Sequence, residues 1–175
     1  GPVRPASYRS NRWAMIFVCD VCGLVHAKTL KQKAHAPKAL EDFVKEVRQQ
    51  CGVEFGRNKT SEGKIVIAGI RSDNENTFRS ATWNETCSRL NLQITHSMPY
   101  SPAQNGKAGR MIQTLKNALR TTCANVDPRV WDFSLEHIVK VWNMKENTAA
   151  SRYHGSSCSP NQILKDLSVN PLFQN

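Results

Sequence analysis

The stretch KIVIAGIRSDNENTF, residues 64–78, decides the fold. Residues 64–70 are apolar almost throughout, which is typical of a buried parallel strand. Asp73 follows where this strand is expected to end, and ligand sites of α/β proteins gather at the carboxyl ends of strands. A single carboxylate cannot support a metal-dependent reaction, so the function of Asp73 depends on which partners the rest of the chain supplies.

Apolar periodicity on both sides of this stretch predicts a mixed α/β fold. We expect strands at 14–19, 24–30, 64–70 and 92–97, and helices at 37–51, 80–91, 105–126, 128–147 and 160–167. This order predicts a mixed sheet flanked by helices, with a further strand missing at its start. We expect one domain over 1–147, followed at 148–175 by a linker and a short C-terminal helix packed on that domain.

The composition of the chain indicates which class of molecule it binds. The chain has 175 residues and a net charge of +10, which favours a polyanionic partner, nucleic acid first. The alternative is a basic face that keeps the domain soluble or docks on an acidic protein. Six scattered cysteines predict reduced thiols in an intracellular protein rather than three disulfides. No apolar run reaches membrane-spanning length, so we expect no membrane partner.

Five segments in this order resemble the catalytic core of retrotransposon integrases, most closely the copia type. They are GPVRPAS…NRWAMIFVCD, LKQKAHA, RSDNENTF, MPYSPAQNGKAGR and CSPNQIL. The resemblance implies a ribonuclease H-like sheet that begins with three antiparallel strands, the first of which carries an Asp. If Gly1 and Pro2 are the family's Gly-Pro, that Asp lies three residues before Gly1; if they are a tag remnant, the first strand was still left out. The family also implies a nuclear location.

The resemblance implies chemistry by two aspartates and a glutamate, which together hold two Mg²⁺ ions. The second family Asp matches Asp73. The 35 residues at positions 74–108 match the separation between that Asp and the family Glu, yet position 109 is glycine. Asp20 is the best substitute for the missing first Asp, although the resemblance places it in a turn. Asp73 is thus the one remaining family carboxylate; we expect weak metal binding there, if any, and no other cofactor.

A nucleic-acid contact is predicted on the helix that begins near Asn105. Positions 109, 113, 116 and 120 share one helical face. In the family this face follows DNA phosphates, and the alternative is an ordinary solvated basic face. The candidate contacts are Tyr100, Gln104, Asn105, Lys107, Arg110, Gln113, Lys116 and Arg120. Elsewhere, Cys19, Cys22 and His26 resemble half of a zinc site, but a closed site needs four ligands, and two incidental thiols are the simpler interpretation.

Three functions remain open. The first is an inactive integrase core that binds nucleic acid without sequence preference, or that acts as a scaffold in a homodimer or larger assembly. The second is a fragment or mutant of an active DNA-joining integrase. The third is a structural subunit that makes protein contacts through the helical surface around Trp131 and Trp142.

Overall fold

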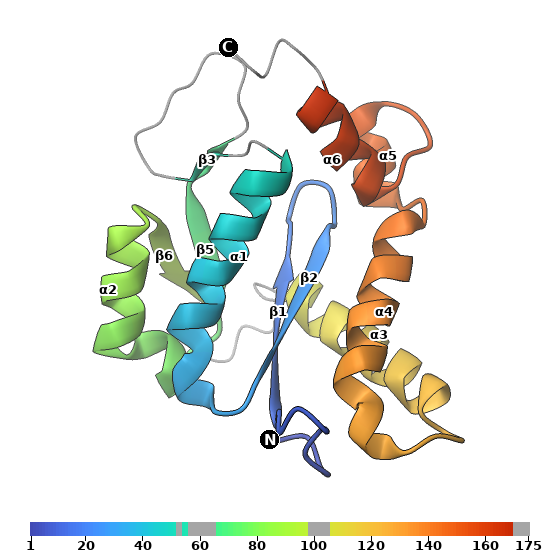
Figure 1. Ribbon diagram of the computed structural model, residues 1–175. Coiled ribbons are helices and arrows are strands. Elements are labelled where there is room, and N and C mark those ends of the chain that lie inside the picture. The colour runs from blue at the N-terminus through green and yellow to red at the C-terminus, as the bar shows by residue number, and fades with distance from the viewer. Residues whose placement is uncertain (52–53, 56–65, 98–105, 170–175) are drawn as a thin grey trace. The chain divides into compact units, whose positions relative to one another are not determined.

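The structure is a computed structural model that describes residues 1–51, 54–55, 66–97 and 106–169 (Figure 1). The chain forms two compact units. Unit 1 comprises Gly1–His35 and Lys107–Ile163, and unit 2 comprises Ala36–Gly106 and Leu164–Asn175. No helix in the described part of the chain is long and apolar enough to cross a membrane.

Unit 1 is built from a hairpin and helices. Strand β1 (Trp13–Val18) pairs antiparallel with β2 (Val25–Leu30), in a register that sets Trp13 opposite Leu30 and Val18 opposite Val25. The later elements are η1 (Lys33–His35), α3 (Gly106–Thr122), η4 (Pro128–Val130), α4 (Trp131–Met144), α5 (Thr148–His154) and the beginning of α6 (Pro160–Val169), which continues into unit 2 at Leu164. Helix α4 packs against β2. The predicted strands at 14–19 and 24–30 are confirmed within one residue.

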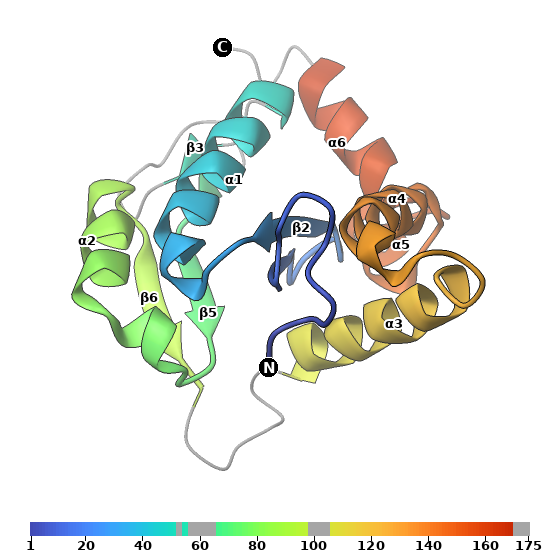
Figure 2. The same ribbon diagram turned by 60° about the horizontal axis from the view of Figure 1, so that its bottom comes forward.

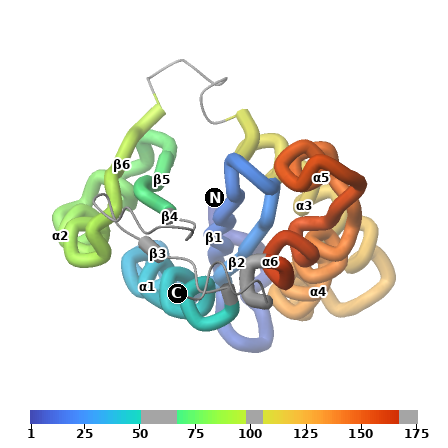
Figure 3. Tube along the Cα trace, turned by 90° about the horizontal axis from the view of Figure 1, so that it is seen from above, coloured from blue at the N-terminus to red at the C-terminus, as the bar shows by residue number. Residues whose placement is uncertain are grey.

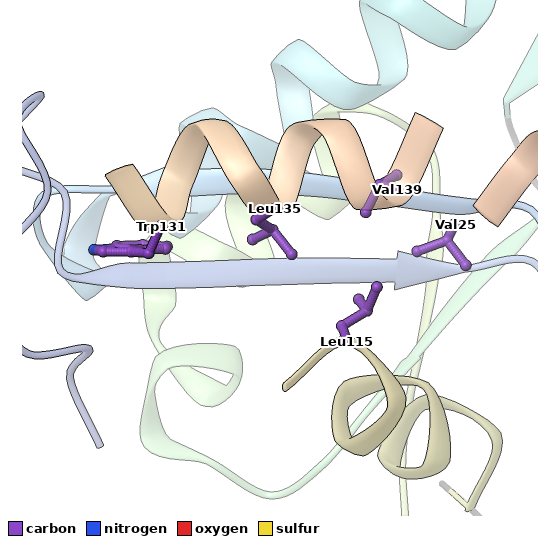
Figure 4. Close-up of a cluster of buried hydrophobic side chains, with 5 residues drawn as sticks. All are labelled: Val25, Leu115, Trp131, Leu135 and Val139. Atoms are coloured by element: carbon purple, nitrogen blue, oxygen red, sulfur yellow. The ribbon is translucent and has the colours of Figure 1, made fainter. Parts of the chain in front are cut away.

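The core of unit 1 lies where α3 and α4 meet the hairpin. Trp131, Leu135 and Val139 recur every fourth residue along α4 and converge on Val25 and Leu115 (Figure 4). Full burial of such side chains stabilises a fold by about 1.5–3 kcal/mol each. Trp131 is only 4% exposed, and Trp142 packs against the same cluster. Trp131 therefore belongs to the core of unit 1 and is not itself available for the predicted protein contact.

Polar side chains of α4 form hydrogen bonds that hold other segments of unit 1 against this core. The Asn143 amide brackets Val25: its oxygen accepts the Val25 N–H at 3.0 Å, and its nitrogen donates to the Val25 carbonyl at 2.7 Å. Asp132 is fully buried and accepts from the Asn11 amide at 2.9 Å and from the Phe133 N–H at 3.0 Å. These bonds satisfy buried groups that would otherwise cost about 1–3 kcal/mol each.

Between Ala36 and Gly106, the described residues of unit 2 form two short parallel ladders and the helices α1 and α2. Its elements are α1 (Ala36–Cys51), β3 (Glu54–Phe55), β4 (Val66–Ile67), β5 (Gly69–Ser72), η2 (Asn76–Arg79), α2 (Ala81–Arg89) and β6 (Gln93–His96). Strand β3 pairs with β4, and β5 pairs with β6, both in parallel. Helix α2 packs against α1 and β6 (Figure 3). The α1 face predicted from Leu40, Val44 and Val47 is buried.

The strand predicted at 64–70 is only partly right. It is two strands, β4 and β5, interrupted at Ala68, and the second ends at Ser72. Gly69 is exposed and Ile70 only half-buried. Among the described strands each has a single partner, so an apolar sequence does not make this segment a buried central strand.

The predicted linker beginning at residue 148 is also wrong, because helix α5 begins at Thr148. The Asn147 side chain caps α5 by accepting the Ala150 N–H at 2.7 Å, and Gly155 ends it with φ 84°. Ser159 and Gln162 then begin α6 with a reciprocal pair of bonds: Gln162 N–H to Ser159 Oγ, and Ser159 N–H to Gln162 Oε1. The predicted last helix is confirmed as α6.

Candidate nucleic-acid interface

Helix α3 has one apolar and one polar face. Met111, Leu115 and Leu119 recur every fourth residue and pack into the core of unit 1. The opposite face is exposed, and it carries Gly109, Gln113, Lys116 and Arg120. Figure 2 shows α3, in yellow, along its whole length. The four positions that the sequence placed on one face are therefore all open to solvent.

The charge of α3 is positive throughout. The helix contains Lys107, Arg110, Lys116 and Arg120 and no acidic residue. No Asp or Glu occurs anywhere between Glu85 and Asp127. This acid-free run is a signal that the sequence interpretation did not use, and it separates α3 from an ordinary surface helix, on which both signs alternate.

Two arginines of unit 1 outside α3 are neutralised by neighbouring carboxylates. Arg9 pairs with Glu136 at 2.6 Å, and Arg129 pairs with Asp127 at 2.6 Å. Within the described residues, by contrast, the Arg110, Lys116 and Arg120 side chains of α3 form no ion pair with a carboxylate. Exposed cations without acidic neighbours are suited to phosphate oxygens, which fix the position of a nucleic acid without reading its sequence.

Position 109 carries no side chain that could bind a metal ion. Gly109 is exposed on the fourth residue of α3, and a Cβ placed there would have nothing within 4 Å. The space that a larger side chain needs is therefore present. The missing carboxylate at this position is a matter of residue identity, not of crowding.

Asp73 lies in unit 2, directly after β5, at the edge where two parallel strands end. Its exposed carboxylate accepts the Glu75 N–H through Oδ1 at 3.2 Å. The loop is tied to the end of β6, because Ser72 Oγ lies 3.0 Å from His96 Nδ1 and Asn74 donates to the Ser97 carbonyl at 2.6 Å. Asp73 is thus held at a strand end, as predicted, but in solvent.

The donor set does not fit a two-metal centre. Of the two family positions described, one carries a carboxylate and the other a glycine, whereas Mg²⁺ needs several oxygen ligands. Nowhere in the described ranges do three His, Cys, Asp or Glu side chains gather as a metal site.

Asp20 lies in the turn that joins β1 to β2, and its side chain is exposed. Its backbone carbonyl accepts a hydrogen bond from Lys107 Nζ, which brings the start of α3 to the hairpin turn. The structure therefore places Asp20 in the turn that the resemblance indicated. Tyr100, Gln104 and Asn105 lie outside the described residues.

Comparison with known proteins supports an integrase relationship. No protein-family model matches the chain. The Tf2-3 and Tf2-4 transposon polyproteins of Schizosaccharomyces pombe are each 32% identical over 82 residues, which is 47% of this chain but only 6% of either polyprotein. The structure resembles a chain of the simian T-cell lymphotropic virus intasome in complex with the PP2A regulatory subunit B56 gamma. That match has a TM-score of 0.65 and 18% identity, and it covers 94% of this chain and 52% of the other.

The chain spans a small part of the polyproteins and about half of the intasome chain. Neither comparison specifies the copia type, which stays a prediction. Sequence similarity to transposon polyproteins and structural similarity to a chain of a retroviral intasome agree with the motifs around Asp73 and Gly109, and the chain has a mixed α/β fold of the ribonuclease H-like kind.

Proposed function

We propose that this integrase-like domain binds nucleic acid through the exposed face of α3, without sequence preference, and that it does not join DNA strands itself. The observation that carries the proposal is the composition of that face. Gln113, Lys116 and Arg120 are exposed with no acidic residue on their helix, and the remaining position of the face is Gly109. A polycationic surface of this kind attracts phosphate and releases counterions when it binds.

The proposed lack of strand transfer rests on residue 109. In-line phosphoryl displacement needs carboxylates that clamp the metal ions at the attacking and leaving oxygens. Glycine supplies no oxygen ligand, and Asp73 alone does not fit a Mg²⁺ pair.

Binding is tested by exchanging Lys116 and Arg120 for glutamine. Each phosphate contact contributes about −0.9 to the slope of log K against log salt on duplex DNA. If Arg110, Lys116 and Arg120 supply three contacts, the slope is about −2.7, and the K116Q/R120Q variant lowers its magnitude by about 1.8. Binding is measured by fluorescence anisotropy with several duplexes of unrelated sequence, at salt concentrations between about 50 and 200 mM. The salt dependence gives the slope of log K, and the comparison of duplexes shows whether binding depends on sequence.

A matched control removes the same charge elsewhere in unit 1. Lys140 is exposed on α4, and Lys145 is exposed directly after that helix. K140Q/K145Q is expected to change the slope by less than about 0.5. If both double variants weaken binding equally, net charge alone explains the attraction and the α3 proposal fails. If K116Q/R120Q binds every duplex as well as the parent, the face is only a solvated surface.

An active enzyme remains the competing proposal, and a direct assay separates the two. The parent chain is incubated with a labelled DNA end, a target plasmid and Mg²⁺ or Mn²⁺. We expect no joined product above background. A joined product that disappears in the Asp73→Asn variant would refute the proposal and indicate a rebuilt metal site.

A role within a protein assembly is a second proposal. It is supported by the similar structure, an intasome bound to a PP2A regulatory subunit. Since Trp131 and Trp142 are core residues, any such contact would have to use other surfaces. Phe133, Val141 and Met144 are exposed on α4 and offer one. Analytical ultracentrifugation of the chain alone and with DNA tests it; a monomer in both conditions argues against self-assembly.

A further inference from the structure

The proposed function does not use a pair of thiols that lies at the hairpin turn of unit 1. Cys19 and Cys22 flank the two turn residues Asp20 and Val21. The turn is closed by two backbone bonds, from Gly23 N–H to the Cys19 carbonyl at 3.1 Å and from Cys19 N–H to the Leu24 carbonyl at 2.8 Å. Within this turn the Cys19 and Cys22 side chains are hydrogen-bonded to each other. Thiols this close are suited to a disulfide, which spans Cα distances of about 4.4–6.8 Å.

Neighbouring elements hold this turn in place. Gly23 adopts a left-handed φ of 71°, and atoms of Asn147 and Ala149 lie 3.4 Å from where its Cβ would stand. From α3, Lys107 Nζ donates to the Asp20 carbonyl. The two cysteines are therefore kept close by a packed turn and do not need to find each other by chain motion.

The two thiols differ in exposure and acidity. Cys19 is half-buried, whereas Cys22 is 7% exposed. The pKa of Cys19 is lowered to about 6, chiefly by the hydrogen bond from Cys22 and to a lesser degree by the charge of Lys107. The same hydrogen bond and burial raise the pKa of Cys22. An accessible thiolate beside a buried, protonated thiol is the arrangement of thiol–disulfide exchange sites.

Two of the other cysteines show the contrast. Cys87 is fully buried, and burial raises its pKa to about 11. Cys158 is 1% exposed and donates to the Ser159 carbonyl at 3.4 Å. Cys123 is half-buried like Cys19, but the next cysteine in sequence lies far from it along the chain. It therefore serves as a single-thiol control.

We propose that Cys19 and Cys22 form a reversible dithiol–disulfide couple that exchanges with low-molecular-weight disulfides. The Cys19 thiolate attacks one sulfur of the reagent R–S–S–R, and the S–S bond breaks to give a mixed disulfide and one thiolate R–S⁻. Cys22 then gives its proton to that thiolate or to water and attacks the Cys19 sulfur. A Cys19–Cys22 disulfide forms, and a second R–S⁻ leaves. The protein loses two electrons and two protons, and the reagent becomes two thiols.

The test uses the full chain and oxidised glutathione at pH 7, with acid quenching and alkylation of the remaining thiols. Trypsin releases residues 13–28, WAMIFVCDVCGLVHAK, which contain both cysteines. We expect this peptide to lose about 2 Da as an internal disulfide, while Cys87 and Cys158 are still alkylated after unfolding. A mixed glutathione adduct that persists on Cys19, or a peptide that remains fully alkylated, would overturn the proposal.

Variants assign the two roles. Cys22→Ser is expected to stop the reaction at a stable mixed disulfide on Cys19, and Cys19→Ser to leave Cys22 unmodified. Cys123→Ser, the control, should not change the yield of internal disulfide. If a turn variant misfolds, the time course of the parent still decides: the adduct on Cys19 should appear first and decay as the internal disulfide grows. Appearance of the first adduct on Cys22 would contradict the assignment.

Discussion

Replacing Gly109 with alanine tests the description of α3 most directly. Glycine within a helix costs about 0.5–1 kcal/mol relative to alanine, because more backbone freedom is lost on folding. The new methyl group meets nothing within 4 Å and is exposed, so it adds neither a clash nor burial. Gly109→Ala should therefore stabilise the domain by about 0.5–1 kcal/mol, which raises the melting temperature by about 1–4 °C in a chain of this size.

Gly155 provides the matched control within the same unit. A Cβ there also has nothing within 4 Å, but Gly155 ends α5 with a φ of +84°. Residues with a side chain are strained in this left-handed conformation by about 1–2 kcal/mol. Gly155→Ala should thus destabilise the domain, although the two glycines are equally uncrowded. The two substitutions are thus expected to change the free energy of unfolding in opposite directions, because the backbone conformations of the two glycines differ.

Urea denaturation followed by far-UV circular dichroism measures both variants beside the parent. Gly109→Glu should stabilise at least as much as Gly109→Ala, because an acidic side chain near the start of a helix gains about 0.3–1 kcal/mol from the helix dipole. A neutral or destabilising Gly109→Ala would refute the reasoning. It would mean that residue 109 is crowded or that its backbone is not helical.

Three shorter predictions concern other sites. Asn143→Ala should lower the free energy of unfolding by about 2–4 kcal/mol in the same denaturation assay, since it leaves the N–H and C=O of Val25 buried and unpaired. A loss below about 1 kcal/mol would contradict the two hydrogen bonds between Asn143 and Val25. Asp73→Asn should leave the melting temperature unchanged, because the carboxylate is exposed, and calorimetry should find no saturable Mg²⁺ binding in parent or variant. Alkylation of Cys19 by iodoacetamide should rise with pH to a plateau above about pH 7, because its thiolate forms through a pKa of about 6; a rise that continues to pH 9 would exclude a lowered pKa.

The spacing of apolar residues predicted the helices well, because the residues that form the buried face of a helix lie close together in the sequence. The spacing of Leu40, Val44 and Val47 identifies the inner face of α1, and Met111, Leu115 and Leu119 do the same for α3. The same spacing predicts a contact surface around Trp131 and Trp142, but the structure places Trp131 in the core and packs Trp142 against it. An apolar stripe does not reveal whether the chain itself or another protein covers it, and here β2 and its neighbours do.

Strand burial was harder to predict, because it depends on partners far away in sequence. Residues 64–70 have the composition of a central strand, yet β5 pairs only with β6 among the described strands and leaves Gly69 exposed. Helix α5 was missed for a different reason. Its signals, the cap at Asn147 and the glycine at 155, are present in the sequence, but the polar residues between them are equally typical of a linker.

The motif around residue 109 indicates where the candidate site lies, but it does not indicate which function the site has. A carboxylate at position 109 would lie about 6 Å along the helix axis from Gln113 and about 10 Å from Lys116, at 1.5 Å per residue. Without metal to neutralise it, that charge would repel phosphate within about one Debye length at physiological salt. Glycine at 109 therefore lacks the carboxylate on which the proposed loss of strand transfer rests, and it avoids a charge that would oppose the proposed phosphate binding. A loss of catalysis and a gain in binding would follow from the same residue, and this is why Gly109→Glu should weaken DNA binding even though it stabilises the fold.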